Sequence, residues 1–157
     1  MRAVVQRVRE ASVAVDGQLT GRIGPGYLVL VAFGGSDTED MIGGKIWNKF
    51  IQKLLGLRLF PDAGGPINAS LTDHGGGLLL VSQFTLYADI SRGRRPSFAG
   101  AVKPDAAKAL YDAFVADVRR SHPVVEEGIF GADMDVSLVN WGPVTIVLDS
   151  ADLAGAT

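Results

Sequence analysis

The stretch that decides the fold class runs from Gly77 to Tyr87 and reads Gly-Leu-Leu-Leu-Val-Ser-Gln-Phe-Thr-Leu-Tyr. Its first part, 77–83, is an apolar run of strand length, and 27–33 is another such run. Continuous apolar runs bounded by glycines are typical of strands buried on both faces. Functional sites are often built where such a strand ends, because its backbone N–H groups leave the ladder and can face a ligand. The alternative is that Ser82 and Thr85 only cap the end of the strand.

Strand and turn signals surround these two runs. Asp16-Gly17 is a strong hairpin signal, and it lies between an alternating segment at 12–16 and a return strand at 18–23. Further strands are predicted at residues 1–9, 57–60, 134–140 and 144–148, with a loop rich in glycine and proline at 61–77.

Two helices are predicted between the strands. Ser36 and Glu39 fit a capping box, and apolar residues recur near helical spacing over 42–57. Pro104 suits the first position of a second helix, which ends before Pro123.

The size and composition indicate a single ordered domain. The chain has 157 residues, of which 47% are hydrophobic and 20% are charged, which excludes a disordered chain. We therefore expect an α+β fold with mixed or antiparallel, barrel-like sheets and two main helices. The domain is predicted to cover residues 1–150, followed by a C-terminal tail at 151–157.

The composition also excludes several kinds of site. The sequence has no cysteine, which rules out disulfides and thiolate metal ligands. Its two histidines, His74 and His122, lie in polar, turn-like contexts, and we expect both at the surface, with no metal site and no cofactor.

No segment is predicted to enter a membrane. The longest stretch without a charged residue, 74–88, has 15 residues, whereas a spanning helix needs about 20 apolar ones. Residues 1–8 contain no apolar core of a signal peptide, so we expect a cytoplasmic protein.

Positive charge is concentrated in two stretches of the chain. Although the formal net charge is -2, residues 43–58 and 92–103 each contain four basic residues and no acidic one. A local positive surface of this kind is typical of contacts with anionic ligands such as nucleic acid. The alternative is two solvated faces that contact nothing. The candidate contacts are Lys45, Lys49, Arg92, Arg94 and Arg95.

A second unusual segment is Asn140-Trp141-Gly142-Pro143-Val144-Thr145. Its Gly-Pro pair interrupts a strand of Val, Leu and Ile, and proline cannot donate to a β-ladder, so a break in the strand is expected. A tight turn alone would also explain this pattern.

Together, Ser-Gln-Phe-Thr-Leu at 82–86 and Asn-x-Gly-Pro-Val-Thr at 140–145 resemble the signature pair of the D-aminoacyl-tRNA deacylase family. The resemblance extends over nearly the whole chain, with further matches at 6–8, 11–13, 26–31, 94–98, 109–111 and 133–140. One position departs from it, because the residue before Gly142 is often acidic in the family and is Trp141 here.

The resemblance implies a homodimeric hydrolase without a cofactor. Its substrate is charged tRNA, from which it cleaves the ester joining a D-amino acid, or glycine, to the terminal adenosine. Gly142 and Pro143, joined by a cis peptide bond, are expected to enter the pocket of the partner subunit. There their carbonyl groups would face the substrate's α-amino group and exclude an L side chain.

The resemblance also assigns roles within the pocket. Ser82 and Gln83 are expected to position the adenosine, and backbone N–H groups near Phe84 and Thr85 to stabilise the oxyanion. The adenosine 2′-hydroxyl is expected to assist the chemistry. Three further residues have open assignments. Arg7 and Met134 match family positions that line the pocket; alternatively, Arg7 is a charge at a strand edge and Met134 fills the core. A nucleophilic Thr85 is a competing hypothesis for the chemistry.

The sequence leaves two alternatives to this function open. One is a non-catalytic tRNA-binding module of the same fold, in which Trp141 is a stacking platform. The other is a serine or threonine esterase unrelated to RNA.

Overall fold

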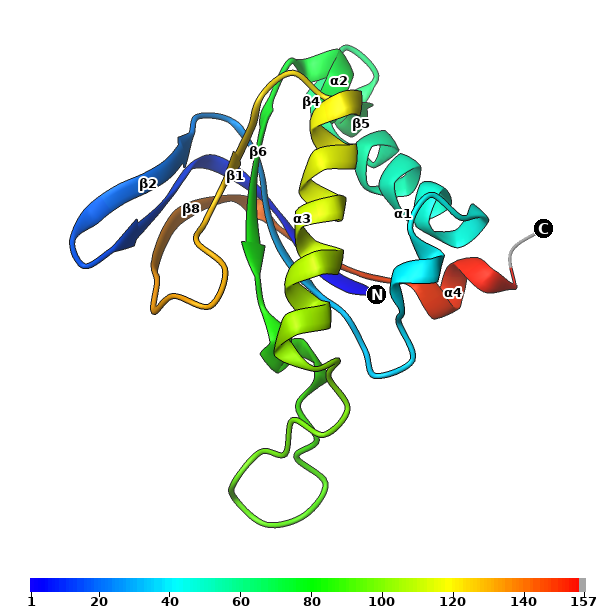
Figure 1. Cartoon of the computed structure of the whole chain (residues 1–157). Coiled ribbons are helices and arrows are strands. Elements are labelled where there is room, and N and C mark those ends of the chain that lie inside the picture. Colours follow the sequence, from blue (N-terminus) through cyan, green and yellow to red (C-terminus); the bar gives the residue numbers. More distant parts are fainter. Residues whose placement is uncertain (156–157) are drawn as a thin grey trace.

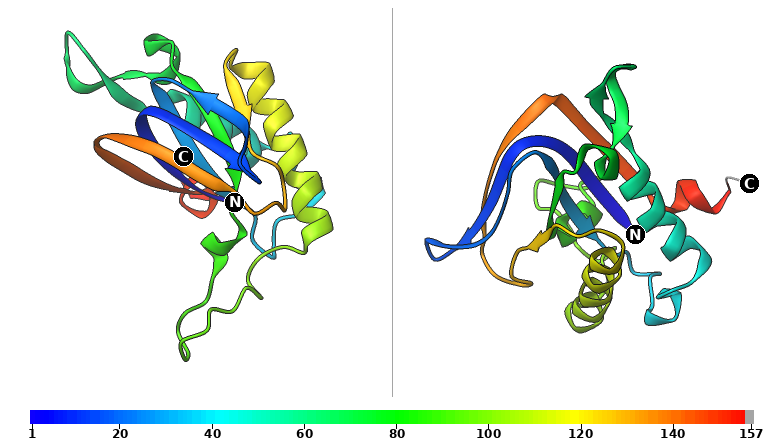
Figure 2. Two further views of the ribbon diagram at one scale, coloured as in Figure 1. Left: turned by 90° about the vertical axis from the view of Figure 1, so that its left-hand side faces the viewer. Right: turned by 90° about the horizontal axis from the view of Figure 1, so that it is seen from above.

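Two long antiparallel strands form the longest pair of the main sheet (Figure 1). In the computed structural model, which describes residues 1–155, β1 (Arg2–Val15) pairs with β8 (Asp135–Asp149) from Arg2 to Ala14. On its other side, the first half of β1 pairs with β3 (Gly26–Ala32), and the second half with β2 (Gln18–Ile23). Because β1 is shared in this way, the sheet bends sharply and nearly closes on itself (Figure 2).

The sheet is mixed, as the sequence predicts. β3 pairs in parallel with β6 (Gly77–Ser82), and β6 pairs in parallel with β7 (Val125–Glu127). Alternate residues of β3 and β6 belong to two different apolar clusters, so both faces of these strands are covered. This double burial explains why their sequences are continuously apolar.

The two main helices pack on one side of this sheet. α1 is Lys45–Gly56 and α3 is Pro104–Ser121, with Pro104 in the first turn as predicted. The Phe114 ring lies edge-on to Trp47 at 5.9 Å between centroids, and the Trp47 indole N–H donates to Asp117 at 2.8 Å. The apolar faces that the two helices bury are formed by Trp47, Phe50, Ile51, Leu54, Leu110, Tyr111, Phe114, Val115 and Val118.

The predicted start of the first helix is wrong. Ser36 and Glu39 do not form a capping box; a short 3-10 helix, η1 (Glu39–Met41), precedes α1, and neither helix has a side-chain cap. Gly43 has φ +73°, a left-handed conformation that ends the first helix before Lys45 begins the second. The capping box of this chain is at Ser70 and Asp73, where the Asp73 amide donates to Ser70 Oγ at 3.2 Å.

The segment predicted as a loop at 61–77 is largely ordered into regular elements. β4 (Arg58–Asp62) and β5 (Gly65–Ser70) form a hairpin, and α2 (Leu71–His74) follows. The Asp62 carboxylate accepts hydrogen bonds from the Gly64 amide at 2.7 Å and from the Asn68 side chain, and these bonds hold the pKa of Asp62 below its usual range. Glycines and a proline at the turn hide this hairpin from an analysis of composition.

The strands predicted separately at 134–140 and 144–148 are one continuous strand, β8. Its register with β1 is interrupted, since Gln6 faces Thr145 and Val8 faces Asn140. Trp141, Gly142 and Pro143 therefore bulge out of the ladder without ending the strand.

One of the histidine predictions is also wrong. His122, which follows the last turn of α3, is buried, and its Nε2 lies 2.7 Å from the Gly76 carbonyl oxygen. His74 is half-buried and stacks on Phe60 at 4.2 Å between ring centroids.

The end of the described chain packs on α1. α4 (Ser150–Ala154) buries Leu153, whose carbonyl accepts from Lys49 Nζ at 3.0 Å. None of the helices within residues 1–155 has both the length and the apolar character to cross a bilayer.

Candidate active site

A cavity of about 540 Å³ lies where β3 and β6 end. Because the two strands are parallel, their carboxyl ends meet at the same edge of the sheet, which is a common place for a binding site. The start of α3, Phe98 and the loop at 130–134 complete the walls. The cavity is mostly apolar, with a few polar side chains, those of Ser82, Gln83 and Asp133.

The segment predicted as catalytic lies at this cavity. Ser82, Gln83 and Phe84 line it, and the Gln83 amide donates to the Val31 carbonyl at 2.8 Å, which continues the β3–β6 ladder for one more step. A short 3-10 helix, η2 (Phe84–Tyr87), begins directly afterwards. The exposed Phe84 ring packs edge-on to Phe98 at 4.9 Å between centroids.

Thr85 lies beside the cavity and is not part of its lining. Its hydroxyl accepts a hydrogen bond from Gln83 Nε2 at 2.6 Å. No hydrogen bond within residues 1–155 joins Ser82 or Thr85 to His74 or His122, since the two histidine rings contact Phe60 and Gly76 instead. Neither hydroxyl therefore has the adjacent base that an activated nucleophile requires.

Met134 also lines the cavity, as do Phe130 and Tyr111. The Tyr111 hydroxyl donates to the Leu80 carbonyl at 2.9 Å, and burial raises the pKa of this phenol above its usual range. The cavity thus combines a fixed aromatic wall with a flexible methionine, a residue type that adapts to ligands of different shape.

Arg7 lies apart from the cavity lining, and it is buried and not a charge at the strand edge. Its Nε donates to the Trp141 carbonyl at 2.7 Å, and its Nη1 donates to the carbonyls of Leu59 and, at 3.0 Å, Pro66. Desolvation, with a smaller contribution from Arg9, lowers the pKa of this guanidinium. One side chain of β1 therefore joins the bulge of β8 to the β4–β5 hairpin.

Gly142 and Pro143 are exposed and lie outside the cavity lining of their own chain. The peptide bond between them is cis. Gly142 has φ +153°, and a Cβ atom there would be 2.6 Å from the Val144 nitrogen, so only glycine fits. The Asn140 side chain supports the bulge, since its Oδ1 accepts from the Val144 amide at 2.8 Å and its Nδ2 donates to the Val144 carbonyl at 3.1 Å.

Two supporting residues were missed in the list of predicted site residues. Asn140 belongs to the second motif, and its position two residues before Gly-Pro could have suggested the side chain-to-backbone bonds that it makes. Arg9 has its guanidinium 3.9 Å from the centre of the Trp141 ring, and nothing in the sequence indicates this contact.

The basic residues predicted to contact nucleic acid lie on two separate elements. Arg92, Arg94 and Arg95 are exposed on a loop closed by backbone bonds between Asp89 and Ser97. This loop projects from the body beyond the start of α3, away from α1 (Figure 1). Lys45 and Lys49 lie on α1 and contribute to a different surface.

Comparisons with known proteins agree with this architecture. The family described as D-Tyr-tRNA(Tyr) deacylase matches residues 4–149. A D-aminoacyl-tRNA deacylase of Solidesulfovibrio magneticus is 61% identical over 158 residues and covers 100% of both chains. Another, from Paracidovorax citrulli, is 55% identical and covers 94% of this chain and 92% of its own.

Two solved structures share the fold of this chain. The c-Myc DNA Unwinding Element Binding Protein has a TM-score of 0.86 at 38% identity, covering 95% of this chain and 98% of its own. A probable eukaryotic D-amino acid tRNA deacylase, at 22% identity, shares the fold with a TM-score of 0.79 and covers 94% and 97%. The family predicted from the two sequence motifs is confirmed: the chain belongs to the D-Tyr-tRNA(Tyr) deacylase family.

Proposed function

We propose that this protein hydrolyses the ester that joins a D-amino acid, or mischarged glycine, to the terminal adenosine of tRNA. Water adds to the ester carbonyl carbon, and the bond from that carbon to the ribose oxygen breaks, which releases the free amino acid and leaves a hydroxyl on the tRNA. The observation that carries the proposal is the position of Ser82, Gln83 and Phe84 on the wall of a 540 Å³ cavity, in a chain that matches this family from residue 4 to 149.

Hydrolysis of an activated ester depends more on stabilising the oxyanion than on a protein nucleophile. Backbone N–H groups near Phe84 and Thr85 are the proposed donors, and one such donor contributes about 2.7–4 kcal/mol to catalysis. Ser82 and Gln83 are proposed to hold the adenosine, whose 2′-hydroxyl assists the reaction. The absence of a histidine partner for Ser82 and Thr85 within the described chain supports a helper that belongs to the substrate.

Chiral selection is proposed to depend on Gly142 and Pro143 of a partner protomer in a homodimer. Two observations support this arrangement. The pair is exposed and lies outside the cavity of its own chain, and the bulge is supported by a buried arginine, Arg7, and by Asn140. A well-supported main-chain loop can present carbonyl oxygens to an ammonium group and exclude an L side chain by its shape. Met134, which lines the cavity, is proposed to contact the amino acid.

The tRNA body is proposed to contact the loop at 89–97 through its phosphates. Arg92, Arg94 and Arg95 are exposed there, on a loop that projects from the body of the protein, where the phosphates of a long polyanion can contact them. Lys45 and Lys49 on α1 are the second proposed contact. A cytoplasmic location would place the protein with this substrate.

Loss of ester from D-Tyr-tRNA and from L-Tyr-tRNA tests the function directly. We expect rapid loss of the D ester only, and a substrate ending in 2′-deoxyadenosine should resist cleavage. Binding of tRNA without turnover would instead support a non-catalytic module. Activity that is indifferent to the tRNA and lost in Ser82→Ala or Thr85→Ala would support an unrelated esterase.

A further inference from the structure

The short helix η2 has few anchors of its own, although it continues directly from the cavity wall. None of its four residues, Phe84 to Tyr87, is buried, and its N-terminal end has no side-chain cap. A segment with so little buried surface depends on contacts from the rest of the fold to keep one position. The position of η2 determines where Phe84 and Thr85 lie relative to the cavity.

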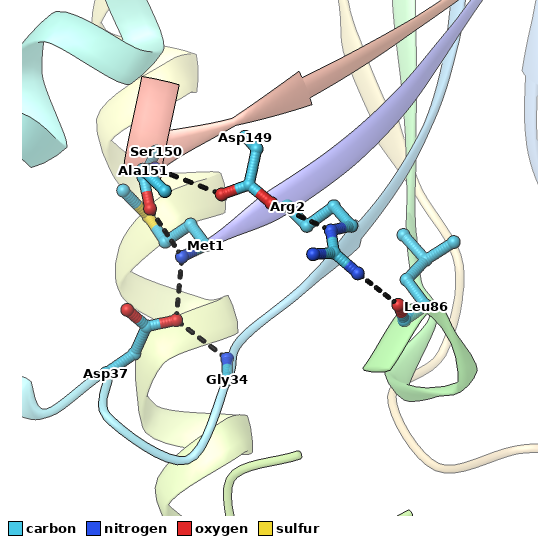
Figure 3. Close-up of polar contacts among 8 residues, drawn as sticks. All are labelled: Met1, Arg2, Gly34, Asp37, Leu86, Asp149, Ser150 and Ala151. Atoms are coloured by element: carbon cyan, nitrogen blue, oxygen red, sulfur yellow. Dashed lines mark hydrogen bonds and ion pairs between the residues drawn. The ribbon is translucent and has the colours of Figure 1, made fainter. Parts of the chain in front are cut away.

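Arg2, the first residue of β1, holds the far end of η2 (Figure 3). Its Nη1 donates to the Leu86 carbonyl at 2.8 Å, and its guanidinium carbon lies 4.8 Å from the centre of the Tyr87 ring. A cation at the last carbonyls of a helix is favourable, because these carbonyls have no partner within the helix. Arg2 therefore supplies both a hydrogen bond and a stacking contact to η2.

Arg2 is itself fixed by Asp149 at the end of β8. Its Nε donates to Asp149 Oδ2 at 2.9 Å, and the other carboxylate oxygen accepts from the Ala151 amide at 3.0 Å (Figure 3). Although desolvation opposes it, these hydrogen bonds hold the pKa of Asp149 below its usual range, so the carboxylate stays charged at neutral pH. Only arginine offers separate N–H groups for a carboxylate and a carbonyl together with a flat surface for a ring.

Tyr87 also contacts Gly34, which follows β3 and the cavity residue Phe33. A Cβ atom at Gly34 would lie 2.7 Å from Tyr87 Cε1, so the ring packs directly on the glycine. The Gly34 amide donates to Asp37 Oδ2 at 2.7 Å, and the same oxygen pairs with the Met1 ammonium at 2.8 Å (Figure 3). The end of η2 is thus in contact with both Arg2 and an anchored turn.

We propose that Arg2 is a positioning residue for the deacylation, acting through Leu86 and Tyr87 to fix η2 and, with it, Phe84 and Thr85 at the cavity. This inference rests on the proposed function of the Ser82–Thr85 segment. Arg2 lies behind η2 and touches none of the residues assigned to the substrate, so its loss should change the rate of the bound complex and leave the binding of tRNA unchanged.

The test compares Arg2→Ala and Arg2→Lys with Arg22→Ala. Arg22 also pairs with a carboxylate, that of Glu10 at 3.4 Å, but has no contact with η2, which makes it a matched control. For Arg2→Ala we expect kcat on D-Tyr-tRNA to fall by about 10- to 100-fold, the range expected from a displacement near 1 Å, with KM within about twofold. Arg2→Lys should recover only a small part of kcat, and Arg22→Ala should match the wild type.

A second variant disturbs η2 through Gly34 and leaves Arg2 unchanged. Gly34→Ala pushes a methyl group against the Tyr87 ring and should lower kcat in the same way, again with KM unchanged. Hydrogen exchange of the amides in 84–88 gives a readout that does not need activity, and it should be faster in Arg2→Ala and in Gly34→Ala than in Arg22→Ala.

Two results would overturn the proposal. One is Arg2→Ala with wild-type kcat and wild-type exchange over 84–88. The other is a loss of activity that disappears when the assay is cooled to a temperature at which the variant is fully folded, since this would indicate a purely structural ion pair. A wild-type protein without deacylase activity would instead reject the proposed function, while the exchange experiment would still decide whether Arg2 fixes η2.

Discussion

The two regions predicted to form the active site differ in how they are built. The segment at 82–87 follows a strand end, lines a cavity of its own chain with its first three residues, and is held at its far end by Arg2. The bulge at 141–143 lies outside that lining, exposes Gly142 and Pro143, and is secured by the buried Arg7 and by Asn140. The first region lines a cavity of its own chain, whereas Gly142 and Pro143 of the second are not part of that lining. This difference is the basis of the proposal that the first region binds the reacting group and the second enters the cavity of another copy.

Mixing two inactive variants tests whether the two regions act in different protomers, and it should give the largest change in deacylase activity. Ala132→Trp should block the cavity, and Gly142→Ala should distort the bulge, because Ala132 lines the cavity and a Cβ at Gly142 meets Val144. Each homodimer should be inactive. If sites are shared between protomers of a symmetric dimer, half of a mixed population carries one intact site, which gives about a quarter of the wild-type activity.

The control for this experiment is a mixture of each variant with itself, and the readout is the initial rate of D-Tyr-tRNA deacylation after the mixture is refolded together. No recovered activity in a population shown to contain mixed dimers would mean that each chain uses its own bulge.

Arg7→Ala should have the next largest effect, and mainly on stability. The substitution removes the Arg7 donor from the buried carbonyl of Leu59 and from the partly buried carbonyls of Trp141 and Pro66. We expect the free energy of unfolding to fall by about 3 kcal/mol, as measured by urea denaturation. Arg9→Ala is the matched control, because Arg9 contacts the same Trp141 ring from an exposed position and should cost much less. Equal losses in both variants would contradict the role given to Arg7.

Neutralising Arg94 and Arg95 together should have the smallest effect on the rate of deacylation. The change should affect only the binding of tRNA. Both are exposed on the loop at 89–97 and have no part in the cavity. We expect weaker binding of charged tRNA and a slope of log K against log salt that is flatter by about 2, with kcat unchanged. Lys45 and Lys49, changed to alanine as a pair, show whether α1 contributes separately. An unchanged slope in Arg94→Ala/Arg95→Ala would remove this loop from the tRNA contact.

Local signals in the sequence predicted the elements whose causes are local. Asp16 and Gly17 both have positive φ, at 50° and 76°, and form the turn of the β1–β2 hairpin that the Asp-Gly pair indicates. Pro104 begins α3, and the continuous apolar runs form the two strands that are covered on both faces. Each of these features depends on a few neighbouring residues or on one uninterrupted pattern.

The features that were missed depend on partners far away in the chain. The strand predicted at 57–60 is the first part of β4, but the glycines and prolines that follow suggest only a loop, so the pairing of β4 with β5, which places the carbonyls of Leu59 and Pro66, was missed. The role of Arg7 could therefore not be seen, because its partners lie 52 and 59 residues away in sequence. His122 was predicted at the surface for the same reason, since its contact is Gly76.

The sequence by itself determined the family, the order of the main strands and helices, and the two motifs, because these are properties of residue types and their spacing. Only the tertiary structure decided which motif lines a cavity and which is presented outward, because the direction of each segment depends on long-range hydrogen bonds. Arg2 and Arg7 show this most clearly. They are two arginines of one strand, five positions apart, and each holds a different half of the proposed site by donating to backbone carbonyls. No local sequence pattern predicts these contacts.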